Sequence, residues 1–371
     1  MSYYVRTISD NAGWKDFLSL PYHIYKDDPN WIPQLNSEVK RVLNPAKNPY
    51  FKNASLRMYV CYSDNVPVSR SIMVINRQHW AKWNRKSAFF GYFESYNDHE
   101  AVKCLFLRIE EECRSLGAEF LEGPFNPNHY SEMGIQLDNF NFDPIFFETH
   151  NPPYYSHLLN ETGFSEILRI HTRINPNIHE TFSKSMDRID PGDIGKDITI
   201  RKFNIRKMNR DLEILREINN EAFENNPFFL PLTMDEYKFS SRFLFLVTTP
   251  GLILFAEYKG KPVGAIQYVI NFNRLVKPLK GRIMPWHLPG LLLKRNRIKE
   301  LVIYSVGIKK AFRHTRISAM LIKSGIKIFQ KYSTVSTTWI YDDNKSIVHI
   351  AELFDMKPHK YFGIYSKSLR S

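Results

Sequence analysis

The stretch that decides the fold is VIYSVGIKKAFRHTRISA, residues 302–319. Its apolar, β-prone beginning predicts the end of a strand over 300–308, and the sequence after it predicts a helix over 316–332. A helix that begins beside the end of a strand presents unpaired N–H groups and the positive end of its dipole. Four basic side chains lie in the same segment: Lys309, Lys310, Arg313 and Arg316. The segment therefore predicts a pyrophosphate-type anion site, the alternative being an ordinary basic loop before a helix.

The elements around this stretch indicate two domains with one order of elements. In the second half we expect strands at 198–203, 252–258, 262–271, 300–308, 335–341 and 361–369, and helices at 210–224, 234–246, 316–332 and 345–354. In the first half we expect strands at 56–62, 67–75, 88–94 and 118–122, and helices at 100–116 and 154–161. The shared order of strands, helix, strand and helix predicts a duplicated fold.

A boundary between the domains is predicted near residues 175–196, where two prolines, two glycines and three aspartates break any periodicity. We expect an N-terminal domain over 1–175, a linker over 176–197 and a C-terminal domain over 198–371. The predicted fold class is α+β, a three-layer α/β arrangement in which each domain has a mixed central sheet flanked by helices.

The two halves differ in charge. Residues 1–196 carry 21 basic and 24 acidic side chains, a net charge of −3, whereas residues 197–371 carry 30 and 14, a net charge of +16. This asymmetry favours a polyanionic partner for the second half, such as nucleotide phosphates, nucleic acid or an anionic membrane. A basic surface that only confers solubility is the alternative.

The rest of the composition indicates a folded protein of the cytoplasm. Aromatic residues make up 14% of the 371 residues, which argues against disorder. The three cysteines form no CxxC pair and no His spacing completes a zinc site, so we expect reduced cysteines and no metal. The N-terminus lacks a signal-peptide pattern, and no apolar run is long enough to span a membrane.

The segment from Arg313 to Ser318 resembles the CoA-binding loop of GNAT-type N-acyltransferases, whose pattern is Arg/Gln-x-x-Gly-x-Gly/Ala. Arg313 matches the first position, while Arg316 and Ser318 stand at the two glycine positions. WIYDDN, residues 339–344, resembles the strand-to-helix segment that follows in that family, and KYFGIYSK, residues 360–367, resembles its closing strands. The tyrosine that many members use as the thiol acid would fall near Ala351, where none stands.

The first half carries a second, wider resemblance. The motifs are LPYHIY (20–25), DPNWIP (28–33), NPYF (48–51), FFGYFE (89–94), GPFN (123–126) and NPPYY (151–155). Together they resemble a bacterial group of tandem GNAT-like proteins of this length, over nearly the whole chain. That group includes bacterial ceramide synthases, which implies transfer of a fatty acyl group from acyl-CoA to a sphingoid-type amine. The usual Val-Gly-Arg of the group is Val68-Ser69-Arg70 here, and a usual acidic residue is Ser336.

The resemblance implies an acyl-CoA-dependent N-acyltransferase with acetyl-CoA or a longer acyl-CoA as co-substrate. Its cofactor-binding residues would be Val306, Gly307, Ile308, Arg313, His314, Thr315, Arg316, Ile317, Ser318, Ala319 and Asn344. N–H groups near Val306 and Gly307 would stabilise the oxyanion. Tyr304, Tyr341 and His314 are the candidate acids for the leaving thiolate; the two tyrosines are equally interpretable as half-buried strand aromatics.

The first half lacks a basic loop before its helix, because SYNDHE, residues 95–100, is acidic. We therefore expect this domain to recognise the amine, with Glu94, His129, Tyr130 and Glu132 as the polar candidates. Glu94 ends a strand, where a carboxylate could act as general base. The alternatives are a salt-bridged surface Glu94 and a His129 and Glu132 that only stabilise a loop.

Residues 274–299, RLVKPLKGRIMPWHLPGLLLKRNRIK, form an insertion with eight basic and no acidic side chains. Such a segment predicts a peripheral contact with a membrane, or else a cover for a core or cleft. Its prolines favour a looped insertion over one continuous helix.

Two further interpretations stay open: a catalytically silent binding protein with this fold, and an aminoacyl-tRNA-dependent ligase. The ligase would need a long helical hairpin arm that the sequence lacks, so nucleic acid is the less favoured partner.

Overall fold

The computed structural model describes residues 2–370 apart from 181–196, 248–249 and 314. Two compact units make up the chain. The first unit consists of residues 1–170, 279–283 and 360–371, and the second consists of 171–278 and 284–359. Two strands cross the boundary between the units. Strand β7 (Ser165–Asn175) begins in the first unit and ends in the second, and β14 (Lys357–Ser368) begins in the second and ends in the first.

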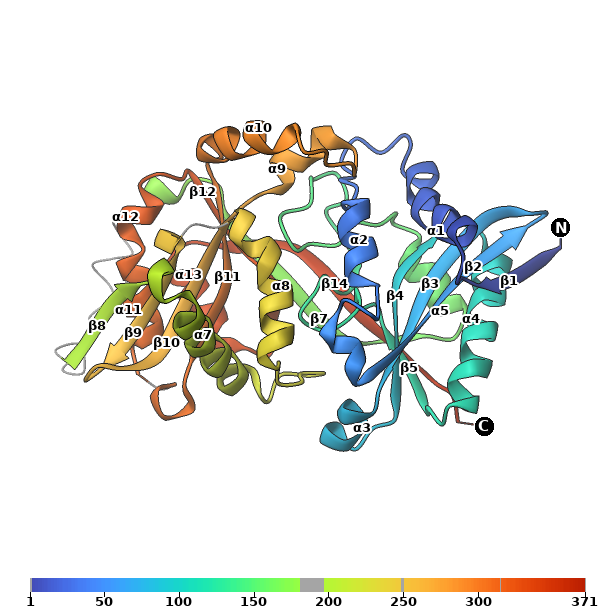
Figure 1. Ribbon diagram of the computed structural model, residues 1–371, viewed down its shortest axis with the longest axis horizontal. Helices are drawn as coiled ribbons and strands as arrows, with labels where there is room; N and C mark the ends of the chain where they lie inside the picture. Colours follow the sequence, from blue (N-terminus) through green and yellow to red (C-terminus); the bar gives the residue numbers. More distant parts are fainter. Residues whose placement is uncertain (1, 181–196, 248–249, 314, 371) are drawn as a thin grey trace. The chain divides into compact units, whose positions relative to one another are not determined.

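The first unit is built on a mixed sheet (Figure 1). Its strand order is β1 (Tyr3–Thr7), β2 (Ala54–Ser63), β3 (Val66–Asn76), β4 (Ser87–Ser95), β5 (Phe120–Gly123) and β14, with β6 (Ile135–Gln136) beside β14. Only β4 and β5 are parallel among these pairs. Asp64 and Asn65 both adopt positive φ, the conformation that a tight turn between β2 and β3 requires.

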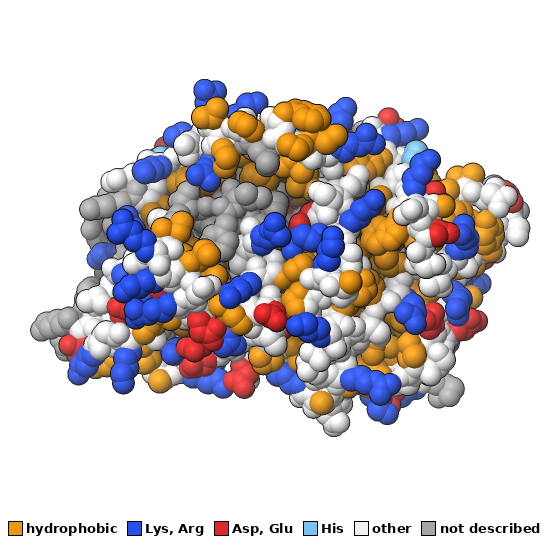
Figure 2. Space-filling model, in the orientation of Figure 1, with side chains coloured by type: hydrophobic (Ala, Val, Ile, Leu, Met, Phe, Trp, Pro, Cys, Tyr) orange, Lys and Arg blue, Asp and Glu red, His pale blue; other side chains and the backbone are white. Residues whose placement is uncertain are grey.

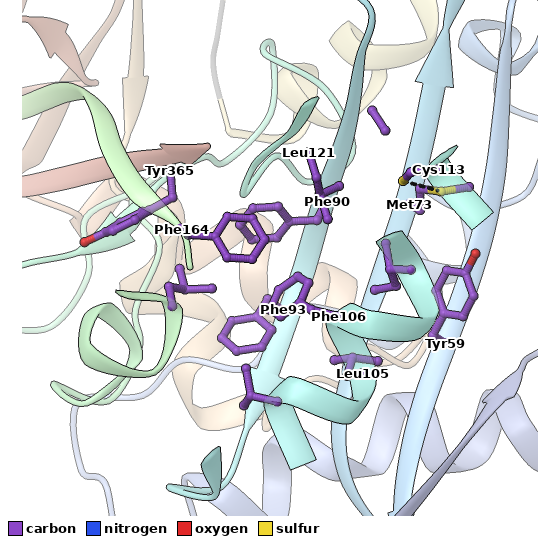
Figure 3. Packing of buried hydrophobic residues seen from close by; sticks show 14 of the residues in the cluster. Tyr59, Met73, Phe90, Phe93, Leu105, Phe106, Cys113, Leu121, Phe164 and Tyr365 are labelled. Atoms are coloured by element: carbon purple, nitrogen blue, oxygen red, sulfur yellow. Dashed lines mark hydrogen bonds between the residues drawn. The ribbon is translucent and has the colours of Figure 1, made fainter. Parts of the chain in front are cut away.

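Five α-helices accompany this sheet among the described residues: α1 (Asn11–Ile24), α2 (Asn36–Val42), α3 (Arg77–Trp83), α4 (His99–Ser115) and α5 (Tyr155–Glu161). Helix α4 begins at Asp98, whose carboxylate accepts from the N–H of Ala101 at 3.1 Å. Its apolar face packs on the sheet, and Phe106 lies between Phe90, Phe93 and Phe164 (Figure 3). This aromatic cluster fixes α4 and β4 against each other.

The second unit repeats the plan. Its strand order is β7, β12 (Thr334–Thr337), β11 (Glu300–Ile308), β10 (Lys261–Ile270), β9 (Ile253–Tyr258) and β8 (Ile198–Lys202), with β13 (Ile340–Tyr341) beside β7. Again one neighbouring pair, β11 with β12, is parallel. The helices are α7 (Met208–Phe223), α8 (Met234–Val247), α9 (Asn273–Val276), α10 (His287–Lys294), α11 (Ile317–Ser324), α12 (Ile326–Phe329) and α13 (Lys345–Leu353).

The structure confirms the predicted fold class, a mixed sheet with flanking helices in each unit. The helix predicted over 316–332 is divided at Gly325, where the Tyr268 hydroxyl lies 2.7 Å from the position of a Cβ atom. The strand predicted over 335–341 is likewise two short strands: β12 pairs with both β11 and β7, and β13 pairs with β7. Strands β1 and β7 and helix α1 had no counterpart in the prediction, and most of the predicted linker, 176–197, lies outside the described residues.

Candidate functional site

The parallel strands of the second unit separate halfway along β11. Pairing with β12 ends at Ile303 and Thr337, while β11 stays paired with β10 as far as Ile308. The N–H of Lys309 donates to the Val263 carbonyl at 2.9 Å. This bond shows which alternate residues of β11 direct their N–H groups toward β10 in the antiparallel ladder. Since alternate residues of such a ladder bond in opposite directions, the N–H groups of Val306 and Ile308 point away from β10.

Within the described part of the chain, no hydrogen-bond partner faces these two N–H groups. They are two residues apart on one open strand edge, as an extended ligand with amide carbonyls would require. The N–H of Gly307 instead belongs to the ladder with Ala265, so the expected oxyanion donors are better assigned to Val306 and Ile308. A Cβ atom at Gly307 would lie 3.0 Å from Ile218 and 3.1 Å from Asn219, because α7 packs closely there.

Helix α11 starts directly after this open edge. A short 3-10 turn, Lys310–Phe312, leads to Arg316, the residue before the helix. No described side chain caps the first turn of α11. The N–H groups of Ile317, Ser318 and Ala319 therefore form the positive end of the helix. The open edge and the helix start thus present two separate groups of backbone donors, at Val306 and Ile308 and at Ile317 to Ala319.

Two basic residues of this loop, Lys310 and Arg313, contact α7 and its C-terminal end. Arg313 donates to the carbonyls of Glu221 and Ala222 at 3.0 and 2.8 Å, near the C-terminus of that helix. Lys310 pairs with Glu224, and its N–H donates to the Glu221 carboxylate at 2.7 Å. Arg313 thus stabilises the C-terminus of α7, a contact that its place in the loop did not reveal, since cations stabilise helix C-termini.

The remaining predicted residues of this loop and its surroundings have local contacts. The Thr315 hydroxyl donates to the Phe312 carbonyl at 2.6 Å, and Asn344 caps α13 by accepting from the Ile347 N–H at 3.3 Å. His314 lies outside the described residues.

Tyr341 is buried and Tyr304 is half-buried in the second unit, and loss of solvation raises the pKa of each phenol above its usual value. Tyr304 forms the bulge of β11 opposite Gln267 and Tyr268. Burial raises the pKa of Tyr237, and Tyr304 adds to that rise. The Tyr341 hydroxyl donates to the Pro227 carbonyl at 3.4 Å. Both phenols hold their proton at neutral pH, as a proton donor must.

In the first unit, the parallel strands β4 and β5 also separate, but side chains of the same unit bond to the N–H groups along the edge of β4. Pairing of β4 with β5 ends at Phe89 and Glu122. Beyond that point Asn126 Oδ1 accepts from the Tyr92 N–H at 2.6 Å, and the Tyr155 hydroxyl accepts from the Ser95 N–H at 2.9 Å. Asp98 occupies the start of α4, so a carboxylate takes the place of an external anion.

Glu94 lies at the centre of a buried polar network in the first unit. Its Oε2 accepts from the Tyr25 and Tyr155 hydroxyls at 2.7 and 2.8 Å, and Oε1 lies 3.7 Å from the Arg70 guanidinium. Burial raises the pKa of Glu94, whereas Arg70 and the two hydroxyls oppose that rise. The carboxylate is therefore held in place by three groups from three different segments.

Glu132 is a half-buried carboxylate of the first unit. It belongs to the hairpin in which Phe125 faces Met133, and it accepts a hydrogen bond from Gln34. Burial raises its pKa to about 7, although the bonds from Gln34 and Asn126 lower it. Burial raises the pKa of Tyr92, the charge of Glu132 adds to the rise, and Arg70 opposes it. His129 lies in the same hairpin, buried, with its ring 4.0 Å from that of Tyr130.

Several polar residues of this network were missed from the sequence. Tyr25, Arg70 and Tyr155 all contact Glu94, and the His150 ring donates or accepts through Nε2 at 2.7 Å from Asp28. The His150 carbonyl accepts from Tyr25 at 3.2 Å. Polar and aromatic residues beside prolines in LPYHIY, DPNW and NPPYY were the signal that could have identified most of them.

Two further observations bear on the chemistry. Within the part of the chain that the structure describes, no group of three or more His, Cys, Asp or Glu side chains is arranged to hold a metal ion. None of the described helices is both long and apolar enough to cross a membrane.

The chain has the tandem GNAT fold. Each of its two units has this order of strands and helices, with one pair of parallel strands that separates where a helix begins. The structure is similar to a tandem GNAT protein from the clavulanic acid biosynthesis pathway, with a TM-score of 0.58, 10% identity and coverage of 100% of this chain and 99% of that one. A GCN5-related N-acetyltransferase from Sphaerobacter thermophilus gives a TM-score of 0.55, 13% identity and coverage of 100% and 96%.

Two curated proteins resemble the sequence along its whole length. Protein YghO of Escherichia coli is 26% identical over 373 residues, covering 98% of this chain and 95% of that protein. The bacterial ceramide synthase of Caulobacter vibrioides is 25% identical over 367 residues, covering 96% and 95%. No protein-family model matches the chain.

Proposed function

We propose that the chain is an N-acyltransferase that moves an acyl group from an acyl-CoA to a primary amine, and that the second unit binds the acyl-CoA. The observation that carries this proposal is the open edge of β11 at Val306 and Ile308, which leads to the uncapped start of α11. The two amide groups of the pantetheine arm are separated by one more methylene than the amides of a peptide, and an extended arm of this kind can bond to such an edge much as a strand does. The pyrophosphate would then reach the N–H groups of Ile317 to Ala319, with Arg316 beside them.

The reaction requires three kinds of group besides the substrates. The amine nitrogen attacks the thioester carbonyl carbon, the carbon–sulfur bond breaks, and the thiolate takes up a proton. The N–H groups of Val306 and Ile308 are our candidates for stabilising the oxyanion. Tyr304 and Tyr341 are the candidate proton donors, supported by the burial that keeps both protonated.

For the amine we propose the carboxylates of the first unit. Glu94 is the candidate general base, and Glu132 and His129 are the candidates for recognition. A raised carboxylate pKa supports this choice, because a base is most effective when its pKa lies near the working pH. Arg70, Tyr25 and Tyr155 would act as positioning residues for Glu94.

The acceptor that we propose is a long-chain, sphingoid-type amine. Its support is the full-length resemblance to a protein named bacterial ceramide synthase. A lipid acceptor implies a protein of the cytoplasm that works at the inner membrane face.

The test is a transfer assay with labelled acyl-CoA, a panel of soluble and long-chain primary amines, and detection of both the amide and free CoA. Ile308→Pro removes one open N–H without removing a ladder bond, so it should weaken acyl-CoA binding while unfolding stays near wild type. A protein that binds acyl-CoA without releasing CoA to any amine is the silent binding protein, and that result rejects the enzyme. Transfer that requires aminoacyl-tRNA supports the ligase instead.

A further inference from the structure

The insertion 274–299 places a strongly exposed apolar face on the second unit. Trp286 is 70% exposed, Leu293 76%, Leu292 49% and Met284 43%, whereas Leu291 is only 8% exposed. Leu291 thus packs inward and holds α10, and the neighbouring side chains point to solvent. Thirteen large hydrophobic residues are exposed in the described chain, and four of them fall within these ten positions, so this is a concentration rather than a scatter.

The helical spacing joins these side chains into one face. Trp286, Pro289 and Leu293 follow one another at three and four residues, and Pro285 and Leu292 lie beside them. All five are exposed. As expected from its prolines, the insertion is not one long helix but two short α-helices with 3-10 turns. We call the exposed set Met284, Pro285, Trp286, Pro289, Leu292 and Leu293 the α10 face.

Positive charge follows directly after the α10 face. Lys294 and Arg297 are exposed and Arg295 is half-buried, and no carboxylate of the described residues forms an ion pair with any of the three. Elsewhere in the insertion, Arg274 is already paired with Glu300 at 2.9 Å. Figure 2 shows hydrophobic side chains gathered over α9 and α10 with Lys and Arg side chains next to them.

We infer that the α10 face is a docking surface for a bilayer that contains anionic lipids. Trp286 and the two leucines have the size and exposure to enter the headgroup boundary, and the unpaired cations that follow can meet lipid phosphates. A nucleic acid would leave the leucines without a partner, and a second copy of this chain that met the α10 face with its own α10 face would bring like charges together. The inference is independent of acyl transfer, since it concerns lipid attachment and not the β11 edge.

The experiment is flotation of the full chain with vesicles of phosphatidylcholine alone and of phosphatidylcholine with phosphatidylglycerol. Wild type should bind the anionic vesicles at least tenfold more strongly, and salt should release part of it. Trp286→Ser with Leu293→Ser, and separately Lys294→Glu with Arg295→Glu and Arg297→Glu, should each reduce binding at least tenfold. Acyl-CoA binding in solution should stay unchanged in both variants.

Matched controls lie at the start of α7 in the same unit. Ile205→Ser with Met208→Ser changes two exposed apolar side chains, and Arg206→Glu with Lys207→Glu and Arg210→Glu changes three exposed cations. Both controls should bind anionic vesicles like wild type. Equal binding by wild type and the α10 variants overturns the inference. So does a dimer in solution that Trp286→Ser with Leu293→Ser dissociates, if vesicle binding is absent.

Discussion

Asn126 Oδ1 accepts a hydrogen bond from the backbone N–H of Tyr92 at 2.6 Å, at the place where β4 leaves β5. The corresponding edge of the second unit has no such internal partner among the described residues, at either Val306 or Ile308. Two copies of one fold thus differ in whether a strand edge is closed by the chain's own side chains. A closed edge cannot bond the pantetheine arm without first losing a hydrogen bond.

We therefore expect one acyl-CoA to bind per chain. Asn126 and Tyr155 occupy the edge of β4, and Asp98 occupies the start of α4, so the first unit offers neither a free edge nor a free helix start. Calorimetric titration with an acyl-CoA measures the stoichiometry directly. Two equivalents per chain would show that the first unit opens to a ligand despite these bonds.

The stability of the protein should depend on pH through Glu132. Burial raises its pKa to about 7, so between pH 4.5 and 7 the folded state holds a proton that the unfolded state has lost. The contribution of Glu132 to the free energy of unfolding is therefore fully present below pH 4.5 and is lost as pH rises through 7. Glu132→Gln should gain stability relative to wild type over this window, by up to roughly 3 kcal/mol.

Denaturant unfolding at a series of pH values measures this difference. Glu111→Gln is the control, since it makes the same substitution at an exposed carboxylate of α4. A constant difference between Glu132→Gln and wild type from pH 4.5 to 7 would exclude the raised pKa.

The role of Glu94 can be tested through Tyr25. The Tyr25 hydroxyl donates to Glu94 Oε2 at 2.7 Å and lowers the pKa of that carboxylate. Tyr25→Phe removes the donor, so the pKa should rise further and the acid limb of the pH profile of kcat/KM should move to higher pH. Tyr22→Phe is the control, because the Tyr22 hydroxyl donates to the Lys280 carbonyl instead. An acid limb that stays in place would remove Glu94 as the general base.

Reversal of charge at Arg313 should weaken acyl-CoA binding at least tenfold, which corresponds to ~1.4 kcal/mol. Arg313→Glu places a negative charge next to the start of α11 and also removes the bonds to the carbonyls of α7. Lys331→Glu makes the same change of charge at an exposed position after α12 and should leave affinity unchanged. Calorimetric affinity that is the same in Arg313→Glu and wild type would reject this loop as the phosphate site.

The sequence predicted the local order of elements around the candidate site well. The strand over 300–308 and the start of the following helix were predicted within one residue, because β-prone and helical periodicity are local signals. The partners of the site residues were not predictable in the same way. Asn126 reaches Tyr92 from 34 positions away and Arg313 reaches α7 across more than 90 positions, and no local pattern encodes such contacts.

Strand β7 is an element of the fold that local sequence patterns did not predict. Its sequence, SEILRIHTRIN, alternates at first and then becomes buried, yet it directly precedes a proline-containing segment that predicts a linker. Only its pairing with β12 reveals that its last residues, Ile174 and Asn175, belong to the second sheet. The raised pKa of Glu132 is another non-local property, since it arises from burial that the sequence alone does not fix.

The most direct test of the account is hydrogen–deuterium exchange of the whole chain with and without an acyl-CoA. The amides of Val306 and Ile308 face an open edge, so the account predicts that ligand slows their exchange, together with that of Ile317 to Ala319. The amides of Tyr92 and Ser95 are already bonded to Asn126 and Tyr155 and should exchange slowly in both states. Protection that appears in β4 and leaves β11 unchanged would contradict the assignment of acyl-CoA to the second unit.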